Sequence, residues 1–227
     1  TFVESVEGIA AACRKLGIPV VSGNVSFYNE AGGKSIYPTP IIGVVGVIEG
    51  DNHVTIKPEK DNLLLLIGDE TNNSLNASQY LKTFHNKVDG EVFAIDWKQE
   101  IALQQVLVEL IAKGLVKAAH DISDGGLGIA LAEMALAAKT GLQITIASDT
   151  PHVALFGEKP SRAVIAIEKA AYYAVKGEVE AVGLQVTELG VVSGDYLQVA
   201  TKEKPLINVS IDKLQKAYQN LSRIMEG

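Results

Sequence analysis

The sequence predicts an α/β protein with a mixed sheet (an α+β arrangement), and three observations support that prediction. Short apolar runs of strand length alternate with longer segments of helical periodicity along most of the chain. Glycine is frequent, with 21 residues, as expected where strands and helices are joined by tight connections. The 227 residues are 47% hydrophobic and 21% charged, which is typical of a globular protein with a sizeable core.

The first 50 residues are predicted to hold one helix and two strands. Apolar residues recur at helical spacing over 6–16, and Gly17 ends the helix. An apolar strand is expected at 18–21, and a second strand at 41–48. Because these elements are too few to close a core, we expect residues 1–50 to be the tail of a domain whose larger part lies outside this sequence.

We expect a second domain, of mixed α/β type, over residues 51–227. The turn at 50–53 is the predicted boundary. Asp96 and Gln99 form a capping-box pattern that predicts a long helix ending near Gly114. The other predicted helices are 77–84, 127–138, 170–182 and 212–225, and the predicted strands are 63–67, 116–119, 142–147, 162–167, 197–200 and short strands through Val186 and Val191.

Composition and charge exclude several classes of function. A net charge of −7 argues against nucleic acid or an anionic membrane as the main partner, and no apolar run reaches the ~20 residues needed to span a bilayer. The single cysteine, Cys13, excludes an internal disulfide and is predicted to be a buried, inert thiol in a cytoplasmic protein. The four histidines have no metal-ligand spacing, so each is predicted to be solvated or hydrogen-bonded rather than catalytic.

The loop after the first predicted strand has the chemistry of an anion and metal site. Gly23 has no Cβ, so its backbone can approach a bulky anion closely. Asn24 offers a hard carbonyl oxygen suited to magnesium, and Ser26 a hydroxyl for a phosphate or an amide. A polar turn between two strands is the alternative, and the residues by themselves favour it.

Longer stretches resemble a known family. Residues 17–30 (GIPVVSGNVSFYNE), 38–46 (PTPIIGVVG) and 120–127 (HDISDGGL) closely resemble phosphoribosylformylglycinamidine synthase, in particular the C-terminal portion of its small-type synthetase subunit. The resemblance implies an aminoimidazole-ribonucleotide-synthetase-type fold, unrelated to ATP-grasp. In it, residues 1–50 would be a partial, ferredoxin-like remnant of the ATP-binding N-domain and 51–227 the C-domain.

The same resemblance implies a ligase of de novo purine biosynthesis. Such an enzyme converts formylglycinamide ribonucleotide, ammonia from glutamine and ATP to formylglycinamidine ribonucleotide, ADP and phosphate, with Mg²⁺ as a cofactor. Its partners would be a glutaminase subunit and a small bridging subunit. The alternatives are another ATP-using member of the superfamily, such as aminoimidazole ribonucleotide synthetase or selenophosphate synthetase, and a non-catalytic nucleotide-binding scaffold.

Three residues acquire roles from this resemblance. Gly23 would lie against ATP, Asn24 would bind magnesium, and Ser26 would contact the ribonucleotide. The catalytic histidine and most acidic metal ligands of the family lie in its amino-terminal half, so no catalytic residue is assigned here, and the isolated chain is expected to be inactive.

Two further segments carry open alternatives. In the loop 121–126, two glycines could present N–H groups to an anion, with magnesium between the aspartates, or Ser123 or Asp124 could simply cap the following helix. In the segment 155–162 (LFGEKPSR), Arg162 could pair with a phosphate, although a surface ion pair is favoured.

Overall fold

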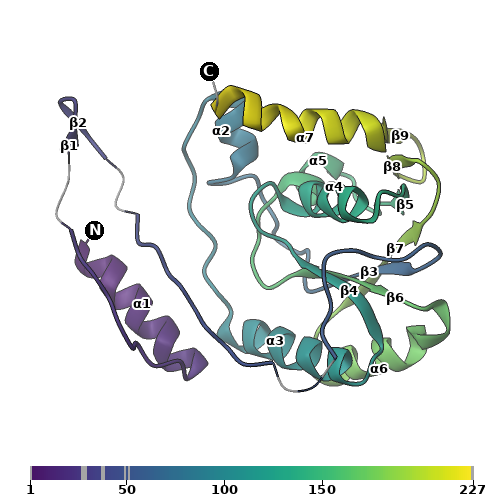
Figure 1. Cartoon of the computed structure of the whole chain (residues 1–227), viewed down its shortest axis with the longest axis horizontal. Coiled ribbons are helices and arrows are strands. Elements are labelled where there is room, and N and C mark those ends of the chain that lie inside the picture. Colours follow the sequence, from purple (N-terminus) through teal and green to yellow (C-terminus); the bar gives the residue numbers. More distant parts are fainter. Residues whose placement is uncertain (1, 27–29, 37–38, 49, 51, 226–227) are drawn as a thin grey trace. The chain divides into compact units, whose positions relative to one another are not determined.

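The protein divides into two compact units, Thr1–Glu49 and Gly50–Gly227. The structure is a computed structural model that describes residues 2–26, 30–36, 39–48, 50 and 52–225 (Figure 1).

The first unit contains one helix and a short hairpin. Helix α1 spans Phe2–Leu16, which confirms the predicted helix, and Gly17 follows it with a φ of +67°. Strands β1 (Glu30–Ala31) and β2 (Lys34–Ser35) pair antiparallel in a hairpin that the sequence analysis missed. No α1 side chain is buried, and Cys13 is only half-buried, so the prediction of a buried thiol was wrong: none of the described residues of this unit is buried, and they therefore offer the helix no core.

The strands predicted at 18–21 and 41–48 are absent from this unit, whose described residues in both stretches are irregular. Their side chains are open to solvent: Val21, Ile41 and Val45 are 92%, 93% and 97% exposed. A strand exists only where a neighbour takes up its N–H and C=O groups. The apolar pattern therefore indicates that these stretches can form strands. The described part of this unit contains no neighbouring strand that pairs with them.

The second unit is built on a seven-stranded sheet in the order β4-β6-β3-β7-β5-β8-β9. All neighbouring pairs are antiparallel except β5 and β8, so the predicted mixed α/β class is confirmed. The strands are β3 (Leu63–Ile67), β4 (Val116–Asp121), β5 (Leu142–Thr145), β6 (Ala163–Ile167), β7 (Val186–Val192), β8 (Tyr196–Ala200) and β9 (Pro205–Ser210).

Helices cover both faces of this sheet (Figure 1). One face carries α3 (Trp97–Ala112) and α6 (Tyr172–Ala181), and the other carries α4 (Gly126–Ala138), α5 (Pro151–Phe156) and α7 (Ile211–Met225). A short helix, α2 (Gln79–His85), and a 3-10 turn, Lys169–Ala171, complete the unit. No helix among the described residues is long and apolar enough to cross a membrane.

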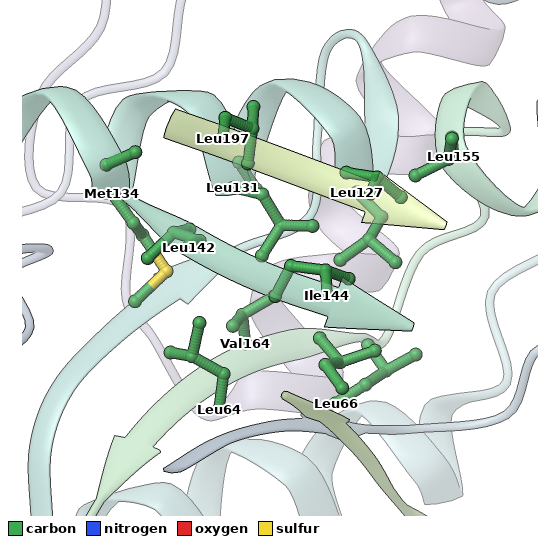
Figure 2. Packing of buried hydrophobic residues seen from close by; sticks show 14 of the residues in the cluster. Leu64, Leu66, Leu127, Leu131, Met134, Leu142, Ile144, Leu155, Val164 and Leu197 are labelled. Atoms are coloured by element: carbon green, nitrogen blue, oxygen red, sulfur yellow. The ribbon is translucent and has the colours of Figure 1, made fainter. Parts of the chain in front are cut away.

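Each face of the sheet has its own core. Strand β3 is buried along its whole length, and its side chains alternate between the two cores. Leu64 and Leu66 pack with Leu131 of α4 on one side (Figure 2). Leu65 packs with Leu110 of α3 on the other. A strand buried on both faces reads as a continuous apolar run, which is why the sequence identified β3 without error in its bounds.

Candidate functional site

The Gly23 to Ser26 segment lies in the first unit and is exposed throughout. The side-chain amide of Asn24 donates to Ser26 Oγ at 3.4 Å. That bond uses the amide nitrogen, so it leaves the carbonyl oxygen of Asn24 available to a cation. A Cβ added at Gly23 would find no atom within 4 Å. The three predicted residues are thus side by side on an open stretch of backbone, and the rest of the motif, 27–29 and 37–38, lies outside the described residues.

The second unit holds a cluster of charged groups at the adjoining ends of β3 and β6. In the antiparallel register Ile67 lies opposite Ala163, so the residues that follow β3 meet those that precede β6. Lys159 donates to Asp69 Oδ2 at 2.9 Å and to the Thr71 carbonyl at 2.6 Å. This cluster was not predicted from the sequence. A signal was present in the sequence, because an acidic pair follows one apolar strand and basic residues precede another.

Arg162 is buried in this cluster, with only 2% of its surface exposed. Its Nε donates to the Lys159 carbonyl at 2.9 Å, its Nη2 donates to the Gly157 carbonyl at 2.8 Å, and its Nη1 lies 3.4 Å from Glu70 Oε1. The prediction favoured an ion pair at the surface. The ion pair with Glu70 is present, but the Arg162 side chain is buried, so its predicted surface position was wrong. A buried guanidinium must satisfy its N–H donors within the protein, and Arg162 does so on the carbonyl groups of its own loop. These hydrogen bonds fix the conformation of the 157–162 loop.

The two carboxyl groups of this cluster have opposite pKa shifts. Burial raises the pKa of Glu70, and the positive charge of Arg162 offsets this only in part. For Asp69, burial acts to raise the pKa, but hydrogen bonds from Thr71 and Lys159 outweigh it and bring the pKa down to about 2. Asp69 is thus the fixed negative charge of the cluster.

The loop between β4 and α4 is closed by the protein's own groups. Gly125 is the N-cap of α4, with a φ of +80°, and no side chain caps the helix, so the alternative of a Ser123 or Asp124 cap was wrong. The Gly125 N–H donates to Glu158 Oε1 at 2.7 Å, and the Gly126 N–H donates to the Ser123 carbonyl at 3.0 Å. Both glycine N–H groups that the sequence offered to an anion therefore already have partners.

The histidines form no metal site among the described residues, where no group of three or more metal-ligating His, Cys, Asp or Glu side chains occurs. His120, on β4, has one ring nitrogen 3.0 Å from Glu133 Oε2 and the other 2.7 Å from the Asp121 carbonyl. The prediction of a hydrogen-bonded residue is confirmed for His120. Its contacts tie β4 to α4, where they support the fold.

Comparison with protein families shows which family the chain belongs to. The family model for the C-terminal domain of AIR synthase related protein matches residues 59–202. The chain belongs to the AIR synthase related protein family. The family's N-terminal domain model also matches, over residues 1–48.

Within the AIR synthase related family, the chain is homologous to phosphoribosylformylglycinamidine synthase subunit PurL, as the sequence motifs predicted. It is 40% identical to PurL of Moorella thermoacetica over 222 residues, which is 96% of this chain and 30% of the relative. It is 38% identical to PurL of Aquifex aeolicus over 226 residues, with the same coverage of 96% and 30%. The chain therefore spans about 30% of the length of these relatives.

Solved structures agree on the fold of this AIR synthase related chain. Thermotoga maritima PurL complexed with FGAR matches with a TM-score of 0.62 at 14% identity, over 71% of this chain and 29% of that one. The same protein complexed with ATP matches with a TM-score of 0.60 at 18% identity, over 74% and 28%. The Thermotoga maritima PurLQS structure matches with a TM-score of 0.58 at 15% identity, over 71% and 27%.

Proposed function

We propose that this chain is the C-terminal part of an ATP-dependent phosphoribosylformylglycinamidine synthase of de novo purine biosynthesis. The observation that carries the proposal is the similarity to PurL over 96% of the chain. The reaction would join glutamine-derived ammonia to formylglycinamide ribonucleotide, with a glutaminase subunit and a small bridging subunit as partners in the cytoplasm. The structures of a related PurL with FGAR and of PurLQS support that assignment of substrate and partners.

The two units would have different roles in this enzyme. Residues 1–50 would be the last part of an ATP-binding domain, and 51–227 the C-terminal α/β domain. The exposure of apolar residues such as Val21 and Val45 supports this division, because strand-forming apolar side chains gain stability only when other strands cover them. In the longer protein those strands would come from the remainder of the ATP-binding domain.

The Gly23 to Ser26 segment would form one wall of the ATP and substrate site. Gly23 has free space on its Cβ side for a phosphate group, and Asn24 has an available amide oxygen for Mg²⁺. Ser26 would hold the ribonucleotide through its hydroxyl. These residues fit the proposed ligands but supply only part of a magnesium shell, which takes about six oxygens. When bound, ATP supplies the phosphoryl group that activates the amide oxygen of the substrate.

A chimeric synthase tests the function. The matching segment of Moorella thermoacetica PurL is replaced by this chain, and ADP release is measured with ammonium, ATP, Mg²⁺ and formylglycinamide ribonucleotide. We expect the chimera to turn over and the isolated 227-residue chain to be silent. A folded chimera with no turnover, beside an active parent enzyme, would contradict the proposed function.

The Asn24→Ala variant of the chimera tests the metal role. Removing a metal ligand is expected to lower kcat/KM by roughly 10–100-fold or more, with the melting temperature unchanged because Asn24 is exposed. Raising the Mg²⁺ concentration should recover part of the rate. The matched control is Asn208→Ala, another exposed amide, which should keep full activity. Equal rates for the two variants would rule out Asn24 as a ligand.

A further inference from the structure

Glu158 occupies the position that an anionic ligand of the β4–α4 loop would take. Its Oε1 accepts a hydrogen bond from the Gly125 N–H at 2.7 Å and another from the Gln79 N–H at 2.8 Å. These N–H groups lie at the starts of α4 and α2, where intrahelical partners are missing and negative charge is favoured. One carboxylate oxygen thus accepts one hydrogen bond from each of two helix starts.

The turn at the start of α4 is formed by two glycines. Gly125 and Gly126 both have positive φ angles, +80° and +71°. A Cβ at Gly126 would lie 2.8 Å from the carbonyl oxygens of Leu155 and Gly157, so the end of α5 and the start of the 157–162 loop pack directly on this turn. Gly126 is therefore needed because another protein segment approaches it closely, whereas a Cβ at Gly125 would meet the Ile129 side chain of α4.

The loop that carries Glu158 is held firmly in place. Lys159 is fixed by Asp69, and Arg162 by carbonyl groups of the loop itself and by Glu70. Ser161 donates to Glu100 Oε2 of α3 at 2.7 Å. Contacts on both sides of Glu158 thus keep its carboxylate at the turn.

We propose that Glu158 is a built-in anion that closes the β4–α4 turn to external phosphates. In the wild-type chain the turn is a structural joint between α2, α4 and the 157–162 loop. The exposed carboxylates of Asp121 and Asp124 add negative charge to the same loop and further disfavour an anionic ligand.

The test uses the full 227-residue chain, inorganic pyrophosphate as the probe and amide NMR as the readout. In the wild type we expect the amide signals of Gly125 and Gln79 to be insensitive to pyrophosphate. In Glu158→Ala, both signals should shift until they saturate. The apparent affinity for pyrophosphate should be at least roughly tenfold higher than that of the wild type, because the competing carboxylate of Glu158 has been removed. The control variant Glu91→Ala, at an exposed position, should behave as the wild type.

Two results would overturn the proposal. One is a wild-type chain whose Gly125 amide responds to pyrophosphate as strongly as that of the variant. The other is a folded Glu158→Ala chain whose Gly125 and Gln79 amide signals do not respond to pyrophosphate.

If the alanine variant fails to fold, Glu158→Gln is used instead, since it keeps the size of the side chain. Its Gly125 amide proton should move upfield in the absence of ligand, because a neutral acceptor forms the weaker hydrogen bond, and an unmoved signal would refute the contact.

Discussion

Asp69 and Lys159 form the ion pair on which the charged cluster of the second unit depends. Their side chains are 20% and 19% exposed, so solvent screens the pair less than it screens a surface salt bridge. Because hydrogen bonds lower the pKa of Asp69 to about 2 against the opposing effect of burial, the carboxylate is more stable in the folded chain than in the unfolded one. The interaction should therefore depend on pH in a definite direction.

We expect Asp69→Asn to lower the free energy of unfolding by about 1 kcal/mol near pH 6, after allowing for solvent screening. The stabilisation by Asp69 is present above its unfolded pKa and is lost as the pH falls through the folded value, that is, from about pH 4 to about pH 2. Urea unfolding of both chains across this range should show the difference shrinking toward zero. The control is Asp149→Asn, at an exposed position. If the free energies of unfolding of the wild type and Asp69→Asn differed by the same amount down to pH 2, the stabilising role of the ionised Asp69 would be contradicted.

For Arg162, the sequence predicted the type of interaction but not its position in the fold. Its charge and its place before an apolar strand correctly indicated an ion pair, and Glu70 is the partner. Its burial could not be anticipated, because burial depends on how the 157–162 loop and the residues after β3 pack around it. Gly23, Asn24 and Ser26 were chosen for their chemistry in the same way, and their ligand roles remain predictions.

At the scale of elements, strand β7 depends on a glycine. β7 lies between β3 and β5, and its register with β3 shifts between Leu64 and Leu65. Gly190 sits at this irregularity with a φ of +150°. A Cβ there would lie 1.8 Å from the Gln143 carbonyl oxygen of β5. The bulge therefore lets three strands meet where a side chain has no room.

Gly190→Ala is expected to cost roughly 3 kcal/mol, because the methyl group must push β5 away from β7 and the backbone adopts an angle disfavoured for alanine. Calorimetric melting of the variant measures the loss. The matched control is Gly177→Ala in α6, where an added Cβ meets no atom within 4 Å. That change should instead stabilise the chain by roughly 0.5–1 kcal/mol. Similar effects of the two substitutions would argue against the bulge.

Helices were easier to predict than short strands. Asp96 caps α3, accepting hydrogen bonds from the Lys98 and Gln99 N–H groups at 3.0 and 3.2 Å, as the pattern of residues predicted. Strand β9 and helix α5 were missed. β9 starts at a proline and alternates weakly in burial, so its identity as a strand comes from pairing with β8 rather than from its own sequence.

At the scale of the whole molecule, the second unit contains all the residues of both of its cores. Strand β3 contributes to the two cores at once, so neither layer of helices can dissociate without exposing its side chains. A unit with a complete sheet and two covered faces meets the requirements for independent folding.

We expect a chain reduced to residues 50–227 to fold alone, because it contains every residue of its two hydrophobic cores. Its amide NMR spectrum should be well dispersed, and calorimetry should give one transition with equal calorimetric and van't Hoff enthalpies. A collapsed spectrum without a cooperative transition would show that the second unit needs the first 49 residues. The corresponding fragment 1–49 should stay largely unstructured, since none of the α1 side chains is buried.

The sequence alone determined the α/β class, most helices, strand β3 and the relation to PurL, because these depend on local periodicity and on short motifs of neighbouring residues. Only the tertiary structure decided which strands form, where Arg162 lies and that Glu158 fills the Gly125 turn. Each of these depends on groups far apart in the chain, whose meeting follows from sheet register and packing.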